Sequence, residues 1–138
     1  MGAPALWVLP VCFPMVMALG GMLALLGLPV PGVEIGIAVS GLALGLFVAL
    51  EVRAPLPVAT ALVGLFAIFH GHAHGTELPE GQSGLLYSIG FVVSTGLLHA
   101  AGIAIGLTHR WKWGQRALRV AGGAIAAVGA WFLWGAVR

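Results

Sequence analysis

The chain has 138 residues, of which 60% are hydrophobic and only 7% are charged, and its mean hydropathy is +1.07. This balance lies outside the range of soluble globular proteins and is typical of membrane proteins. The formal net charge is +2, and four of the six Lys and Arg residues fall in residues 109–119. A short basic segment in an apolar chain is first a signal of membrane orientation, so we expect the lipid bilayer as a partner and no nucleic acid.

Taken in chain order, proline, glycine and charged residues divide the sequence into five apolar runs. A helix needs about 20 apolar residues to cross the hydrocarbon core of a bilayer. We therefore predict an all-α integral membrane protein in which residues 1–138 form one domain, a compact bundle of about five transmembrane helices. The predicted helices cover roughly residues 5–28, 33–50, 56–75, 84–108 and 117–137.

Charge in the predicted loops indicates how the bundle lies in the membrane. The positive-inside rule places the basic loop 109–119 in the cytoplasm, which makes the acidic loop 76–83 external and the loop with Arg53 internal. The N-terminus is then inside and the C-terminus outside, and we expect the bacterial inner (plasma) membrane. The first apolar run lacks a basic n-region, so we expect it to be retained rather than cleaved as a signal peptide.

Glycine is frequent, with 22 residues, and much of it recurs at the spacing of helix contacts. Helices associate in lipid through close approach of their backbones, because burying apolar surface against apolar lipid gains little. We therefore expect tight contacts between helices at these positions. They are Gly41 and Gly45, Gly71 and Gly75, Gly102 and Gly106, and Gly122 with Ala126 and Ala130.

The stretch AIFHGHAHGTELPE, residues 67–80, gathers three histidines and two glutamates at the end of the third run. On a helix, His70, His74 and Glu77 share one face at i, i+4 and i+7, whereas His72 points roughly the other way. Two imidazoles and a carboxylate that meet at one point suit a divalent ion such as Ni²⁺, Co²⁺ or Zn²⁺. If the helix unwinds at Gly71 or Gly75, all three histidines meet instead. The alternative is a solvated histidine cluster that binds nothing.

Two further ionisable residues lie in other runs. Glu34 begins the second run on the same side as Glu77, where it supplies a ligand or draws cations to the mouth, unless it is only a charge favoured by the helix dipole. His99 lies about 15 residues into the fourth run, roughly 22 Å from its external end. It is either a buried histidine bonded to a carbonyl or hydroxyl group of its helix or a deeper ligand station on an ion path.

Several candidate ligands lie at the external end of the predicted bundle, and one lies deeper in the membrane. This distribution suits passage of a metal ion better than permanent storage. The sequence contains no H-E-x-x-H motif, no nucleophile–base–acid set and no phosphate-binding loop. We therefore expect a protein that is not an enzyme and holds no permanent cofactor. The ligand types suit a borderline divalent ion such as Ni²⁺, Co²⁺ or Zn²⁺ as the transported ion.

The residues that carry these ligands are familiar from one family. GLFAIFHGHAHGTELP, residues 64–79, resembles the signature helix of the hydrogenase/urease accessory permease family (HupE/UreJ), membrane proteins associated with nickel or cobalt uptake. Residues 28–45 and 90–106 also resemble that family, so the similarity covers nearly the whole chain. The resemblance implies a metal path formed by His70, His72, His74, Glu77, Glu34 and His99.

The start of the chain departs from the family pattern. Family members generally begin with a further helix that carries a histidine and an Asp-His signature, whereas this sequence has no aspartate and no histidine before His70. The resemblance therefore implies that the family's first helix is missing here. A bundle without that helix exposes a polar, glycine-rich seam, which favours a homo-oligomer or a partner that supplies the missing helix.

Three functions are compatible with these residues. The first is membrane transport of nickel or cobalt, by facilitated diffusion or secondary transport, through a path lined by His and Glu. The second is a non-conducting accessory or sensing subunit that binds the metal at the membrane surface. The third is a haem-binding electron-transfer subunit with histidines as axial ligands. The resemblance favours the first.

Overall fold

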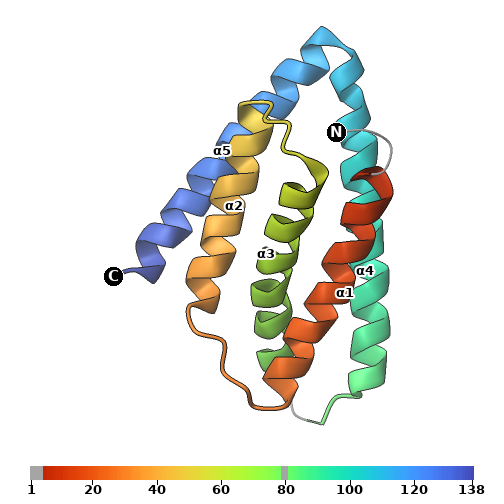
Figure 1. Cartoon of the computed structure of the whole chain (residues 1–138), viewed down its shortest axis with the longest axis vertical. Coiled ribbons are helices and arrows are strands. Elements are labelled where there is room, and N and C mark those ends of the chain that lie inside the picture. Colours follow the sequence, from red (N-terminus) through yellow and green to blue (C-terminus); the bar gives the residue numbers. More distant parts are fainter. Residues whose placement is uncertain (1–4, 79–80) are drawn as a thin grey trace.

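The computed structural model describes residues 5–78 and 81–138, and these ranges are built of helices joined by short loops. They contain no strand, so the prediction of an all-α fold is confirmed. Pro79 and Glu80, which belong to the predicted loop 76–83, lie outside the described residues. The elements are α1 (Ala5–Leu25), α2 (Val33–Ala49), α3 (Leu56–Thr76), α4 (Gly84–Gly106), the 3₁₀-helix η1 (Leu107–Arg110) and α5 (Lys112–Ala136) (Figure 1).

Among the described residues, four helices are long and apolar enough to cross a membrane, namely α1, α3, α5 and the helix that includes most of α4. The prediction of an integral membrane protein is therefore confirmed. Helix α2 is equally apolar but has only 17 residues, which at 1.5 Å per residue is roughly 26 Å. It lies at the lower limit of the length that spans a bilayer, shorter than its neighbours.

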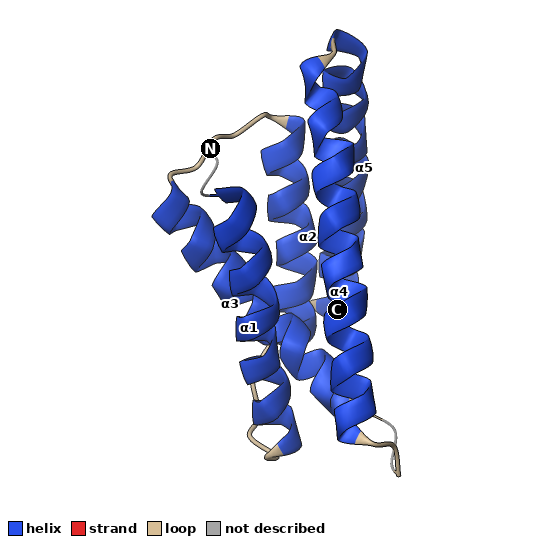
Figure 2. Ribbon diagram, turned by 90° about the vertical axis from the view of Figure 1, so that its right-hand side faces the viewer, coloured by secondary structure: helices blue, strands red, loops and turns tan. Residues whose placement is uncertain are grey.

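The bundle consists of two packed pairs of helices and a fifth helix beside them. Helix α1 packs along α3, and α2 packs along α5, while α2 and α3 meet over a smaller face. Both views place α2 between α3 and α5 (Figures 1 and 2). Helix α4 contacts α1 over a limited face, and η1 joins it to α5 at one end of the bundle. Only 6% of its most apolar stretch is buried, so α4 is the helix least covered by the chain.

Glycines set the distance between the paired helices. A Cβ added at Gly71 would overlap the main chain of Met17 on α1, and a Cβ at Gly45 would overlap the main chain of α5 near Gly122. Close backbone approach of this kind is what holds helices together in lipid. The expected contacts are also confirmed at Gly41, Gly75 and Ala126.

The small residues of α4 and one of α5 do not make the contacts that we expected. A Cβ at Gly102 or Gly106 would have no atom within 4 Å, because α4 turns this face away from the described part of the chain. In α5, Ala130 is exposed and Gly129 takes its place against Leu42. The residues of α5 that face inward are therefore spaced four apart from Gly122 to Ala126 and three apart from Ala126 to Gly129.

Helix α5 begins at Lys112, earlier than the predicted residue 117, so most of the predicted basic loop is helical. The Gln115 side chain donates to the His109 carbonyl at 2.9 Å and so satisfies a main-chain acceptor at the corner between η1 and α5. Gly114 allows the tight turn, because a Cβ there would overlap the Thr108 carbonyl. We predicted a loop here because the residues are charged. Charged side chains, however, leave the main-chain hydrogen bonds of a helix intact.

Candidate metal path

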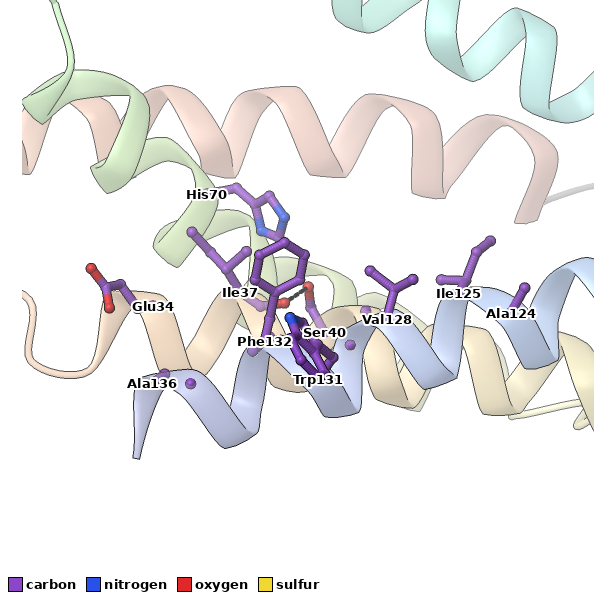
Figure 3. Close-up of a pocket in the computed structure, with 14 residues that line it drawn as sticks. Glu34, Ile37, Ser40, His70, Ala124, Ile125, Val128, Trp131, Phe132 and Ala136 are labelled. Carbon is purple, nitrogen blue, oxygen red and sulfur yellow. Dashed lines mark hydrogen bonds between the residues drawn. The ribbon is translucent and has the colours of Figure 1, made fainter. Parts of the chain in front are cut away.

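Three of the six predicted metal residues, Glu34, His70 and His74, line two cavities of the bundle. A cavity of about 700 Å³ between α2, α3 and α5 is lined by Glu34 and His70 (Figure 3). A smaller cavity of about 300 Å³ between α1, α3 and α4 is lined by His74. The last turns of α3 therefore supply one histidine to each cavity, and apolar side chains form most of the remaining walls.

The His70 imidazole is oriented by its own helix. Its Nδ1 lies 2.9 Å from the carbonyl oxygen of Phe66. Because a carbonyl oxygen only accepts, Nδ1 carries the proton and Nε2 keeps its lone pair. Metal-binding histidines usually donate from their second ring nitrogen in this way. The half-buried His70 thus presents a nitrogen that is able to bind a metal ion.

Glu34 stands at the mouth of the larger cavity. It lies in the first turn of α2 and is exposed. Figure 3 shows its carboxylate at one end of the cavity, with the His70 imidazole nearer the middle. The positive end of the α2 dipole favours a negative charge at this position. Glu34 thus brings a negative charge to the cavity that His70 lines, and its assignment to the metal path stays a prediction.

His74 faces α4 across the smaller cavity. The Tyr87 hydroxyl lies 3.5 Å from Nδ1 of His74 and donates to the His74 carbonyl at 3.2 Å. Phe91, one turn further along α4, packs edge-on against the imidazole with ring centroids 5.0 Å apart. Tyr87 is the chain's one tyrosine, and no motif in the sequence marks it as part of the site. The spacing of Tyr87 and Phe91 by four residues was the signal that both face the same neighbour.

His72 lies apart from the other histidines and lines neither cavity. Only 9% of its surface is exposed, and its Nε2 donates to the Leu28 carbonyl oxygen at 3.0 Å. That carbonyl belongs to the segment linking α1 to α2, which turns at Gly27 with φ of 70°. The hydrogen bond ties α3 to this connection and leaves only Nδ1 available for a metal ion. The assignment of His72 to the metal path stays a prediction.

His99 and His70 reach Phe13 of α1 from two different helices. The ring centroid of Phe13 lies 5.8 Å from that of His70 and 5.6 Å from that of His99. Nδ1 of His99 donates to the Thr95 carbonyl at 2.8 Å, so its Nε2 also keeps a lone pair. The hydrogen bond to a carbonyl of its own helix, one of our two alternatives for His99, is present and is compatible with the other. Phe13 had no signal in the sequence, because it is one phenylalanine in an apolar run.

The structure does not bring His70, His74 and Glu77 to a single ion. Among the described residues, no three His, Cys, Asp or Glu side chains lie close enough together to hold a metal ion. The two imidazoles are one helical turn apart and are held by different groups, the Phe66 carbonyl and the Tyr87 hydroxyl. Glu77 ends α3 as its exposed C-cap residue. The described residues do not form the three-ligand centre that we expected on this face, and the assignment of each residue to the metal path stays a prediction.

Comparison with known proteins places these residues in a family. Residues 1–132 match the family model described as HupE / UreJ protein. The chain is 46% identical over 135 residues to Protein HupE of Rhizobium leguminosarum bv. viciae, an alignment that covers 98% of this chain and 71% of that protein. No solved structure matches the chain. Together with the helical fold, the family match and this identity show that the chain belongs to the HupE/UreJ family.

Proposed function

We propose that this protein moves nickel or cobalt ions across the membrane as a facilitator or secondary carrier. The chain belongs to a family of accessory, permease-like membrane proteins of hydrogenase and urease with a nickel- or cobalt-related role, and it is not an enzyme. The observation that carries the proposal is the pair of histidines at Phe13. His70 and His99 each donate from Nδ1 to a carbonyl of their own helix and keep Nε2 for a metal ion.

The proposed path begins at the end of the bundle that carries Glu34, His70, His74 and Glu77, with His72 as a further candidate, and continues to His99. Glu34 raises the local concentration of cations, and His70 and His74 then each offer one imidazole nitrogen. Conduction requires sites that are strong enough to capture an ion and weak enough to release it. Separate single donors meet this requirement, because an ion at each station keeps part of its water shell.

The direction of transport in this proposal follows from charge. The positive-inside rule places η1 and the start of α5 in the cytoplasm, so the histidine-rich end of α3 faces outward. Ions then enter from outside and move towards His99. Imidazole and carboxylate ligands also accept Zn²⁺, and selectivity among these metals depends on coordination geometry.

Uptake of radiolabelled nickel and cobalt into proteoliposomes tests the proposal. We expect uptake by the wild-type protein and its loss in His70→Ala and in His99→Ala. The matched control is His109→Ala, because His109 is an exposed histidine of η1 that also donates from Nδ1 to a helix carbonyl, at 2.9 Å, yet lies off the path. Undiminished uptake by both path variants would contradict the proposal.

Two other results would replace the proposal with another function. Saturable nickel binding that depends on His70 and His74, with no uptake, would support a non-conducting binding or sensing subunit. A Soret band in the purified protein would support a haem-binding subunit.

A further inference from the structure

A third cavity lies at the opposite end of the bundle from the histidine path. It measures about 650 Å³ and is bordered by residues of α1, α2, α3, the end of α4 with η1, and α5. Its polar and charged lining residues are Glu51, Arg53, His109, Gln115 and Arg119. The remaining lining is largely aliphatic and aromatic. None of these residues has a part in the proposed metal path.

The two arginines of this cavity keep hydrogen-bond donors for a ligand. Nε of Arg119 donates to the Ala49 carbonyl at 3.0 Å and lies 4.0 Å from the Glu51 carboxylate. Both contacts run through Nε, so the terminal guanidinium nitrogens of Arg119 are not used by the described residues. Arg53 makes no hydrogen bond or ion pair within residues 5–78 and 81–138. Two guanidinium groups therefore border one cavity with most of their donors uncommitted.

The charge around this cavity is positive. Glu51 offsets one arginine, at a distance where an ion pair between groups that are 57% and 55% exposed is weak. The adjoining η1 and first turn of α5 add Arg110, Lys112 and Arg116. Five of the six Lys and Arg residues of the chain thus lie in or next to this cavity, and the sixth, Arg138, is at the other end of α5. An anion is the ligand that such a field attracts.

The apolar part of the cavity indicates what kind of anion fits. Leu9, Phe47 and Leu62 line it beside the arginines, so one ligand has to satisfy charged and apolar walls together. Trp111 and Trp113 stack at the same end, with ring centroids 6.0 Å apart, and both are exposed. Exposed tryptophans mark the level where headgroups meet acyl chains. The cavity therefore lies at the depth of a phospholipid's phosphate.

We propose that this cavity binds an anionic phospholipid, with the phosphodiester at Arg53 and Arg119 and an acyl chain along the apolar wall. The planar guanidinium group binds phosphate oxygens through paired hydrogen bonds, which suits arginine to this role. Basic pockets between transmembrane helices near the membrane surface bind anionic headgroups in the same way. The site is independent of the metal path, because it needs no histidine of α3 and no transport.

Thermal unfolding of the purified protein in a neutral detergent tests the proposal, with dioctanoyl phosphatidylglycerol, dioctanoyl phosphatidylcholine or inorganic phosphate added. We expect phosphatidylglycerol alone to raise the melting temperature in a saturable manner. Arg53→Gln and Arg119→Gln should each weaken this binding by about tenfold, because each removes a charge-assisted contact. Arg138→Gln is the matched control and should bind as the wild type does, since Arg138 lies over the Trp134 ring, 4.4 Å from its centroid, outside the cavity.

Three results would overturn the proposal. They are equal stabilisation by phosphatidylcholine, an equal shift with inorganic phosphate alone, and unchanged phosphatidylglycerol binding in both arginine variants. Arg119→Gln also removes the contact to Ala49 and so risks misfolding, whereas Arg53 makes no such contact. Arg53→Gln therefore keeps the test decisive. Native mass spectrometry of the wild type from mixed-lipid nanodiscs gives a second readout, in which equal retention of both lipids contradicts the proposal.

Discussion

Replacing Phe13 by alanine removes the ring that packs near both proposed ligand stations, His70 and His99. Its centroid lies 5.8 Å from the His70 ring and 5.6 Å from the His99 ring, and these histidines come from α3 and α4. We propose that an ion passing from one imidazole to the other moves along Phe13 and displaces its ring. If the proposed path is correct, Phe13 forms a barrier to transport rather than a ligand.

The size of that barrier follows from the two ring contacts. An edge-on or tilted aromatic pair contributes about 0.5–1.5 kcal/mol beyond the area that it buries. Two such contacts sum to about 1–3 kcal/mol, which the ring loses when it swings aside. Removing a barrier of this size accelerates the step by about 5- to 160-fold. Phe13 is only half-buried, so the loss of stability should be smaller than the roughly 3–5 kcal/mol of a fully buried phenylalanine.

The assay is the initial rate of nickel uptake into proteoliposomes, normalised to folded protein. We expect Phe13→Ala to raise this rate, and the Phe13→Ala/His99→Ala double variant to lose uptake because the second station is gone. Phe47→Ala is the control, since Phe47 lines the cavity at the other end of the bundle. A folded Phe13→Ala protein with an unchanged or lower rate would refute the reasoning. A faster double variant would show a leak instead of a path.

Three further changes test the packing. His72→Ala should lower the free energy of unfolding in detergent by about 0.5–1.5 kcal/mol, because it removes the hydrogen bond to the Leu28 carbonyl, while uptake per folded protein persists. Intact stability with lost uptake would assign His72 to the metal path instead. Gly71→Leu should abolish the monodisperse peak in size-exclusion chromatography, because even a Cβ overlaps Met17, whereas Gly102→Leu, in open space, should leave it unchanged. Glu51 has a φ of 55°, a left-handed backbone conformation that favours glycine. The Glu51→Gly variant should therefore have a free energy of unfolding about 1 kcal/mol higher than the Glu51→Ala variant. Equal melting temperatures of the two variants would argue against strain at this turn.

The number, order and approximate ends of the helices followed from the sequence because proline, glycine and charge interrupt long apolar runs. The start of α5 did not, because Lys112 and Gln115 looked like loop residues although a helix accepts them readily. Glycine spacing predicted the contacts at Gly45 and Gly71 but failed at Gly102. Spacing shows that a face is able to approach another helix, whereas the arrangement of the whole bundle decides whether a helix lies there.

The candidate site was predictable in its residue types and less so in its geometry. Helical periodicity placed His70 and His74 on one face, yet each ring meets a different helix, and this depends on where α1, α2 and α4 lie. Phe13 contacts His70 and Tyr87 contacts His74, but no sequence motif predicts either contact. Aromatic residues are common in apolar runs, so their position between ligands appears only when the helices are assembled.

The distribution of charge along the bundle connects the two proposals. Glu34 and Glu77 lie at the histidine-rich end, and Arg53 and Arg119 lie at the other, together with most of the basic residues. A divalent cation is attracted to the first end and repelled as it nears the second, and low-dielectric walls strengthen both effects. An anionic headgroup held by Arg53 and Arg119 lowers the positive potential where the ion leaves. If both proposals hold, release of the ion from His99 is the step of transport that we expect to depend on lipid composition.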